Sequence, residues 1–382
     1  MRYAIDGRYI QDHFPGIGRY TYNLIDALAR VAPAEQFVVL HNPALRNTRY
    51  DIAALARYPN VALRDVDVPT LSLREQFQLP TSNVQFLHSP YYIKPYATHV
   101  PSVVTIFDLI PLRVPEDSLT WRARLFFRLA VLLAARTATR IIAPSVATRE
   151  DLVTLLRVPP EKIDVIPLAA NACFAPQSSA EVARVRARHR LANEYVLSVG
   201  INKPHKNLAT LIEAWARLET DAALVIAGAW DERYAGEPGG REAREQSKIS
   251  ILSLPKGENR KSKVCLIHDI EDADLPALYS GAAVFVMPSL YEGFGLPPLE
   301  AMACGAPVVC SNAASLPEVV GDAALLVNPH NVGEIAAAIQ RILTDTALRD
   351  ELRAKSLARA ARFSWERTAR ETLQVYQVAC DK

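Results

Sequence analysis

Short, continuously apolar runs alternate along the chain with longer segments in which apolar residues recur every three or four positions. Uninterrupted apolar runs are typical of strands that are buried on both faces of a parallel sheet. In the first half of the chain they cover residues 3–6, 37–40, 61–66, 86–89, 103–108 and 140–144. Residues 17–30 have the helical period, with Tyr20, Leu24 and Leu28 on one side. This alternation predicts a doubly wound α/β domain.

The same pattern starts again after residue 193. Apolar runs cover residues 195–199, 223–227, 264–267, 284–287, 307–310 and 324–327. Asn207 precedes a helical segment, and we expect it to be the N-cap. Residues 171–192 contain few large apolar side chains, so we expect a linker between two Rossmann-like domains whose ligands lie in a cleft at the carboxyl ends of the strands. The polar segment 231–263 predicts a helix followed by a long mobile loop.

Composition agrees with a globular chain of two domains. Half of the 382 residues are hydrophobic and 22% are charged, which excludes a wholly disordered protein. The net charge of +2 gives no global positive field, so we expect no nucleic-acid partner. The five cysteines form no C-x-x-C pair, which argues against a disulfide framework or a zinc ribbon and favours a reducing, cytoplasmic location.

One basic, lipophilic segment raises the question of membrane contact. The first residues of the chain lack the long apolar stretch of a signal peptide. Within 121–140, arginines interrupt an apolar sequence whose longest charge-free run, 129–135, is too short to cross a bilayer. A helix here could lie on the anionic inner face of the cytoplasmic membrane. The alternative, which we favour, is a core helix whose arginines face water.

The segment 289–305, SLYEGFGLPPLEAMACG, has the pattern of a phosphate-binding turn. It follows an apolar run, and Pro297 suits the first turn of a helix. The backbone N–H groups of Phe294, Gly295 and Leu296 would then lie at the positive end of that helix, which attracts phosphate. Glycine at 295 lets the backbone turn and approach a ligand closely.

Two glutamates flank this turn, with seven residues between them. Glu292, before the turn, could reach a sugar. Glu300, on the first helical turns, could accept hydrogen bonds from a ribose diol. The alternative is a pair of solvated carboxylates, but the glycine-rich turn and helix between them favour the ligand-binding interpretation.

A second loop, SVGINKPHKN at 198–207, follows the first strand of the second half. After the strand-ending Gly200, Lys206 could neutralise a leaving diphosphate, assisted by His205 or Lys203. A lysine after a strand is more often a solvated surface charge, and this loop alone would not decide between the two.

Two features of the first half are weaker. PGIGR at 15–19 resembles part of a dinucleotide-binding fingerprint, and its Gly16 and Gly18 could place amides near a phosphate. Asp108 ends an apolar run, so it either points toward a ligand or caps the next turn. Two D-x-D triplets, at 65–67 and 272–274, could hold Mg²⁺, but we interpret the second as a helix cap and expect no metal.

Together these segments resemble the retaining glycosyltransferases of family 4, which have the GT-B fold of two Rossmann-like domains. The resemblance runs through PGIGRYTYNL, VVTIFDLIPLRVPE, IIAPSVATREDL, SVGINKPHKNLATLIEAWARL, PSLYEGFGLPPLEAMACGAPVV, SLPEVVGDAALLVNP and RFSWERTA, in the order of the family. It covers essentially the whole chain and is strongest with the bacterial mannosyltransferase-like branch that builds O-antigen and other surface polysaccharides.

The resemblance implies a division of labour between the halves. Residues 193–365 would bind a nucleoside diphosphate sugar, with Lys206 on the diphosphate, Glu300 on the ribose, and Glu292 and the 294–296 amides on the sugar and its phosphate. Residues 1–170 would bind the acceptor, and 366–382 would return to that domain. The expected catalytic residues are then Lys206, Glu292 and Asp108.

The implied reaction moves a hexose with retention, without a metal or other cofactor, to a glycan or polyprenyl-linked acceptor. GDP-mannose is the favoured donor, with other GDP- or UDP-sugars as alternatives. Two departures from the family pattern are Phe107, where many relatives have histidine, and His205, where arginine is common. They support a competing hypothesis, a non-catalytic GT-B subunit that binds a sugar nucleotide or partners an active transferase. A sugar-nucleotide epimerase of the same architecture is a third alternative.

Overall fold

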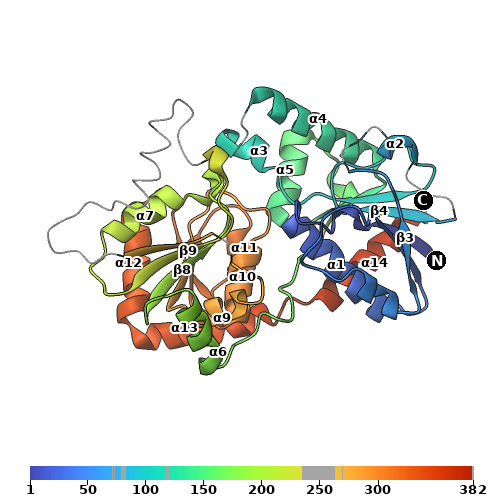
Figure 1. The fold of residues 1–382 in the computed structure, drawn as a ribbon. Helices are drawn as coiled ribbons and strands as arrows, with labels where there is room; N and C mark the ends of the chain where they lie inside the picture. Colours follow the sequence, from blue (N-terminus) through green and yellow to red (C-terminus); the bar gives the residue numbers. More distant parts are fainter. Residues whose placement is uncertain are drawn as a thin grey trace. The chain divides into compact units, whose positions relative to one another are not determined.

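The computed structural model describes residues 1–382 except 71, 73, 79–82, 118–119, 235–262, 269 and 381–382. The chain divides into two units (Figure 1). The first comprises Met1–Leu112, Ser118–Ala169 and Phe363–Lys382, and the second comprises Arg113–Asp117 and Ala170–Arg362. The segment 171–192, where we expected a linker, is counted in the second unit and contains helix α6 (Ser179–Arg188). Most of the helix and loop expected at 231–263 lies outside the described residues.

The first unit is built on a seven-stranded parallel sheet of order β3-β2-β1-β4-β5-β6-β7. The strands are β1 (Arg2–Asp6), β2 (Gln36–His41), β3 (Val61–Asp65), β4 (Phe86–Ser89), β5 (Ser102–Thr105), β6 (Arg140–Ala143) and β7 (Ile163–Val165). The order reverses between β1 and β4, as in a doubly wound sheet. This confirms the predicted fold class, although the short β7 gave no recognisable signal in the sequence.

Helices cover this sheet and include the last one in the chain. They are α1 (Pro15–Val31), α2 (Glu75–Gln78), α3 (Ile110–Arg113), α4 (Trp121–Thr137), α5 (Val146–Leu156) and α14 (Trp365–Cys380). The short 3-10 turns are η1 (Gly7–Tyr9), η2 (Ala53–Arg57) and η4 (Pro160–Lys162). Helix α14 packs beside α1 (Figure 1) and supplies Tyr376 to the core.

The attachment of α14 includes a buried polar chain. The Tyr376 hydroxyl lies 2.5 Å from His88 Nδ1, and His88 Nε2 lies 2.9 Å from the hydroxyl of Thr105. Burial lowers the pKa of His88 to about 3, so the imidazole is neutral. His88, at the end of β4, therefore joins the sheet to the final helix without introducing a charge into the core.

The second unit repeats the architecture with a six-stranded parallel sheet of order β10-β9-β8-β11-β12-β13. The strands are β8 (Tyr195–Val199), β9 (Ala223–Ala227), β10 (Lys263–Ile267), β11 (Val284–Met287), β12 (Val308–Ser311) and β13 (Ala324–Val327). Besides α6, the helices are α7 (Leu208–Ala216), α9 (Leu275–Ser280), α10 (Leu296–Ala303), α11 (Leu316–Val320), α12 (Val332–Thr344) and α13 (Thr346–Ala360). The 3-10 turns η3 (Pro115–Asp117), η5 (Pro204–Lys206) and η6 (Glu232–Tyr234) complete the unit.

Two expected helix caps have other partners. Asn207 precedes α7 in the left-handed region, at φ 56°, and makes no side-chain cap; its amide donates to the carbonyls of Pro288 and Pro329 instead. Asp274 precedes α9, also without a side-chain cap, and pairs with Arg184 and Arg188 of α6. Both side chains therefore join separate segments of the second unit rather than capping a helix.

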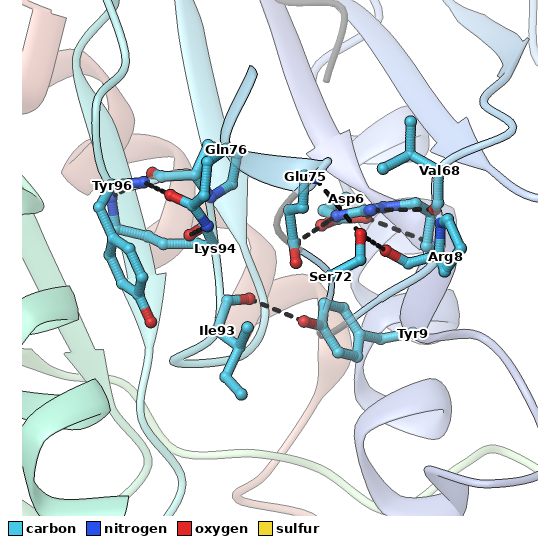
Figure 2. Close-up of polar contacts among 12 residues, drawn as sticks. Asp6, Arg8, Tyr9, Val68, Ser72, Glu75, Gln76, Ile93, Lys94 and Tyr96 are labelled. Atoms are coloured by element: carbon cyan, nitrogen blue, oxygen red, sulfur yellow. Dashed lines mark hydrogen bonds and ion pairs between the residues drawn. The ribbon is translucent and has the colours of Figure 1, made fainter. Parts of the chain in front are cut away.

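A buried charge network lies at the carboxyl end of β1 (Figure 2). The Arg8 guanidinium donates to Asp6 at 2.7 Å and to Glu75 at 2.6 Å, and all three side chains are fully buried. Burial alone would lower the pKa of Arg8, but the two carboxylates outweigh it and raise that pKa. The paired charges let an arginine occupy the interior of the unit.

Helix α2 connects this network to the segment that follows β4 (Figure 2). Glu75 reaches Arg8, while the next residue, Gln76, donates to the Lys94 carbonyl at 2.9 Å and accepts from the Tyr96 amide at 2.8 Å. The Lys94 ammonium is itself buried and donates to the Pro95 carbonyl at 3.0 Å. Burial lowers the pKa of Lys94 to about 8. Adjacent residues of one short helix thus connect the segments that follow the neighbouring strands β1 and β4.

Replacing Arg8 by methionine should unfold the first unit more easily. Arg8→Met keeps an apolar stem but leaves Asp6 and Glu75 buried without their cation, which costs about 3–5 kcal/mol. Urea unfolding followed by circular dichroism should show a lower midpoint. The control Arg57→Met removes an exposed arginine that pairs with Asp26, and should change the midpoint little. Equal midpoints for the two variants would contradict a stabilising role for the network.

Candidate functional site

The turn between β11 and α10 has the geometry that its sequence predicts. Gly295 precedes α10 with φ 108°, a region that favours glycine, and a Cβ there would lie 2.8 Å from Leu316 Cδ2. The helix begins at Leu296 and continues with Pro297 and Pro298, which carry no N–H. Backbone donors at this end of α10 therefore come mainly from the turn itself, where Phe294, Gly295 and Leu296 lie.

A serine that the sequence did not single out holds this turn. The buried Ser315, just before α11, places its hydroxyl 2.8 Å from the carbonyl oxygens of both Glu292 and Phe294. The single hydroxyl hydrogen is shared between these two carbonyls, so Ser315 contacts the backbone on both sides of Gly293. A serine at the start of a short helix has no distinctive signal in one sequence, which is why it was missed.

Both glutamates that flank the turn are buried, so the alternative of two solvated carboxylates is wrong. Glu292 is 7% exposed and Glu300 is 3% exposed. Glu300, on α10, accepts a hydrogen bond of 3.2 Å from the hydroxyl of Tyr279 on α9. Burial acts to raise the pKa of Glu292, but the nearby Lys206 and His205 outweigh it and hold that pKa below its usual value. Glu292 is therefore ionised at neutral pH.

The structure brings Lys206 and Glu292 together from different loops. Lys206 ends η5, and its ammonium donates to Glu292 Oε1 at 2.7 Å. The lysine side chain is 14% exposed and the glutamate side chain 10%. The stem of Lys206 passes Gly200, where a Cβ would lie 3.4 Å from Lys206 Cε. Three predicted residues thus form one partly accessible ion-pair site at the carboxyl ends of β8 and β11.

Gly228, which follows β9, supports this arrangement. A Cβ on Gly228 would lie 2.4 Å from the carbonyl oxygen of Gly200, far inside contact distance, and the residue has φ 144°. The loops after β8 and β9 therefore approach so closely that a side chain at position 228 has no room unless one backbone shifts. The position of Gly228 at the carboxyl end of a central strand was a signal that the sequence analysis did not use.

His205 has a different partner from the expected diphosphate. Its ring is 6% exposed, and Nδ1 lies 2.7 Å from Oδ2 of Asp117. Asp117 lies far from His205 in the sequence, in the segment Arg113–Asp117 that belongs to the second unit. Contact of His205 with a diphosphate stays a prediction, while its contact with Asp117 is a feature that the sequence analysis missed.

The other predicted residues lie in the first unit. A Cβ on Gly18 would lie 3.1 Å from the Tyr9 carbonyl, so this glycine lets α1 pack closely against the segment after η1. Gly16 is exposed, and a Cβ there would meet nothing within 4 Å. Asp108 Oδ1 accepts from the Ile110 amide at 3.0 Å, which agrees with the turn-capping interpretation. Ligand-binding roles for these residues stay predictions.

No group of three or more His, Cys, Asp or Glu side chains in the described parts of the chain could hold a metal ion. The described helices also include none that is long and apolar enough to span a membrane.

Comparisons with known proteins point to one family. Residues 15–172 match the family model "Glycosyltransferase Family 4", and residues 180–359 match "Glycosyl transferases group 1". The chain is 31% identical over 379 residues to the O-antigen chain mannosyltransferase B of Escherichia coli, covering 95% of this chain and 96% of that protein.

Solved structures share the fold. Sucrose-phosphate synthase from Thermosynechococcus elongatus has a TM-score of 0.74 at 22% identity, over 99% of this chain and 98% of that one. HepE from Anabaena, solved in complex with UDP and glucose, has a TM-score of 0.72 at 20% identity, over 98% of this chain and 99% of that one. Both neighbours span the two Rossmann-like units, as the predicted architecture requires.

Replacing Gly228 by alanine should destabilise the second unit. The added methyl group would clash with the Gly200 carbonyl, and a backbone that alanine rarely adopts adds strain, so we expect a loss of more than about 1 kcal/mol. Gly333→Ala is the matched control, because a Cβ there meets its first neighbour at 3.5 Å, an ordinary contact. Thermal unfolding of both variants tests this, and an unchanged melting temperature for Gly228→Ala would show that the two loops can separate.

Proposed function

Because the chain belongs to family 4 of the glycosyltransferases, we propose that its second unit binds a nucleoside diphosphate sugar where β8 and β11 end. The observation that carries the proposal is the pair formed by Lys206 and Glu292 next to the N-terminus of α10. A diphosphate needs positive charge and N–H donors, which Lys206, the 294–296 turn and the helix dipole supply. A sugar attached to it would lie within reach of Glu292.

The chemistry of transfer fits these groups. Breaking the bond between the anomeric carbon and the diphosphate leaves negative charge on the leaving phosphate and positive character on the sugar. Lys206 and the N-terminus of α10 stabilise the negative charge on the leaving phosphate. The ionised Glu292 faces the positive character that develops on the sugar. Glu292 is ion-paired with Lys206, and we propose that it orients the sugar while the acceptor attacks from the front face with retention, without a carboxylate nucleophile. The leaving phosphate then helps to accept the proton of the acceptor hydroxyl.

We propose mannose as the transferred hexose and GDP-mannose as the donor. The support is the similarity, over nearly the whole chain, to a protein named as an O-antigen chain mannosyltransferase. Glu300, buried on α10, would accept hydrogen bonds from the ribose. The acceptor would be a glycan or a polyprenyl-linked glycan, as expected for the synthesis of a surface polysaccharide.

A membrane-bound acceptor agrees with the surface of α4. Phe127, Val131 and Ala134 face the core, as a core helix requires. The remaining surface is not only basic, because large apolar side chains are exposed on it: Trp121, Leu125, Phe126, Leu129 and Leu133. Exposed arginines at 122, 128 and 136 accompany them, and no acidic residue lies between Asp117 and Glu150. We propose that this face rests on an anionic bilayer.

Lys206→Ala should reduce turnover more than tenfold, because it removes charge stabilisation from the leaving diphosphate (about 1.4 kcal/mol for each factor of ten). Release of GDP from GDP-mannose by the purified protein measures this. The control Lys355→Ala removes a surface lysine of α13 that pairs with Glu351, and should leave turnover unchanged. Unchanged turnover in the Lys206 variant would contradict its role. A parent protein that binds GDP-mannose but does not consume it would favour the non-catalytic subunit.

The double variant Trp121→Ala, Phe126→Ala should bind anionic vesicles about tenfold more weakly, since two exposed aromatic side chains no longer enter the bilayer interface. Sedimentation with phosphatidylglycerol–phosphatidylcholine vesicles measures the binding. Leu326→Ala, Val378→Ala is the control, because it removes exposed apolar side chains from other elements. Equal binding of both double variants, or no binding by the parent protein, would contradict membrane contact through α4.

A further inference from the structure

Asp117 contacts both the main chain and the ring of His205, the residue that precedes Lys206 in the loop 198–207. It ends η3, in the segment Arg113–Asp117 of the second unit, and its side chain is only 4% exposed. One carboxylate oxygen accepts from the backbone N–H of His205 at 3.0 Å, and the other lies 2.7 Å from Nδ1 of the same residue. Both oxygens of one carboxylate therefore hold a single residue, at its main chain and at its ring.

His205 is held from the other side as well. Its carbonyl accepts a hydrogen bond of 2.7 Å from the backbone N–H of Leu290. Leu290 lies two residues before Glu292, at the start of the turn that leads to α10. The peptide groups on both sides of His205 are thus fixed, one by Asp117 and one by the Glu292 turn. Lys206 is the next residue, and its side chain extends from this fixed backbone to Glu292.

The charge on Asp117 is retained despite its burial. Burial acts to raise the pKa of Asp117, but hydrogen bonds and charge from His205, with the charge of Lys203, outweigh it and lower that pKa. Its carbonyl accepts a hydrogen bond of 2.8 Å from the hydroxyl of Tyr234 in η6, which ties down its main chain. A buried carboxylate with these partners gives stronger hydrogen bonds than a neutral acceptor would.

We propose that Asp117 is a positioning residue for Lys206. It acts through His205, by fixing the 3-10 turn Pro204–Lys206 so that the ammonium lies beside Glu292 and over Gly200 rather than in solvent. The inference rests on the proposed function, because it assigns the residue that orients the group we place on the diphosphate. His205 serves in this arrangement as the connector between a carboxylate and the lysine, which is a different role from binding the diphosphate itself.

Asp117→Ala should weaken GDP binding and lower turnover of GDP-mannose, each about tenfold, as expected for coupling within one hydrogen-bonded network. Glu116→Ala is the matched control, since it removes the same charge from an exposed neighbour on the same turn and should change neither value. Asp117→Asn keeps an acceptor for the His205 amide and should restore part of the loss. Isothermal titration with GDP and the turnover assay provide the measurements.

A double-mutant cycle separates positioning from general stability. If Asp117 acts through Lys206, then adding Asp117→Ala to Lys206→Ala should cost less than about twofold in GDP affinity, because the oriented group is already absent. The same tenfold loss in both backgrounds would overturn the inference and indicate a structural role. So would GDP affinity that is unchanged in Asp117→Ala while Lys206→Ala weakens it. Failure of the parent protein to bind GDP or any nucleotide sugar would instead count against the proposed function.

Discussion

An ammonium and a carboxylate that are buried together set the constraint on which the second unit's candidate site depends. Neither Lys206 nor Glu292 could be taken from water alone without a large cost, so each requires the other at hydrogen-bond distance. The need to place the two charges together also constrains the backbone around them. Gly200 leaves room for the lysine stem, Gly228 lets the neighbouring loop approach, and Ser315 holds the glutamate turn. Each of these small residues serves the placement of two charges.

The charge network of the first unit provides an instructive contrast. Arg8 is enclosed by Asp6 and Glu75, and none of the three side chains is exposed. Such a network has no surface through which a ligand could compete for the arginine, so its effect is to join β1 to α2. The Lys206–Glu292 pair keeps a small exposed fraction at both side chains. This accessibility is why we propose that a phosphate or a sugar hydroxyl contacts the Lys206–Glu292 pair, whereas the Arg8 network is purely structural.

Local pattern was sufficient for most of the architecture. The strands, the glycine turn before α10, and the loop with Lys206 could be predicted because each leaves its signal within a few consecutive residues. The three-residue β7 is too short to show a period. Contacts between distant segments left no such signal: Asp117 with His205, Ser315 with Glu292, and Asn207 with Pro329. Lys206 and Glu292 were each expected at the site, one toward the diphosphate and the other toward the sugar, but no spacing in the chain predicted that they form an ion pair.

Helix α14 belongs to the first unit although it follows the second unit in sequence, and this affects when the first unit can fold. The ring of Tyr376 packs against those of Phe86 and Tyr3, whose strands lie in the sheet nearest the start of the chain. During translation those strands emerge early, yet their core lacks this aromatic partner until the final helix has left the ribosome. The later unit, which ends at Arg362, has all its elements available first. The N-terminal core therefore cannot be complete before the segment after Arg362 has been synthesised.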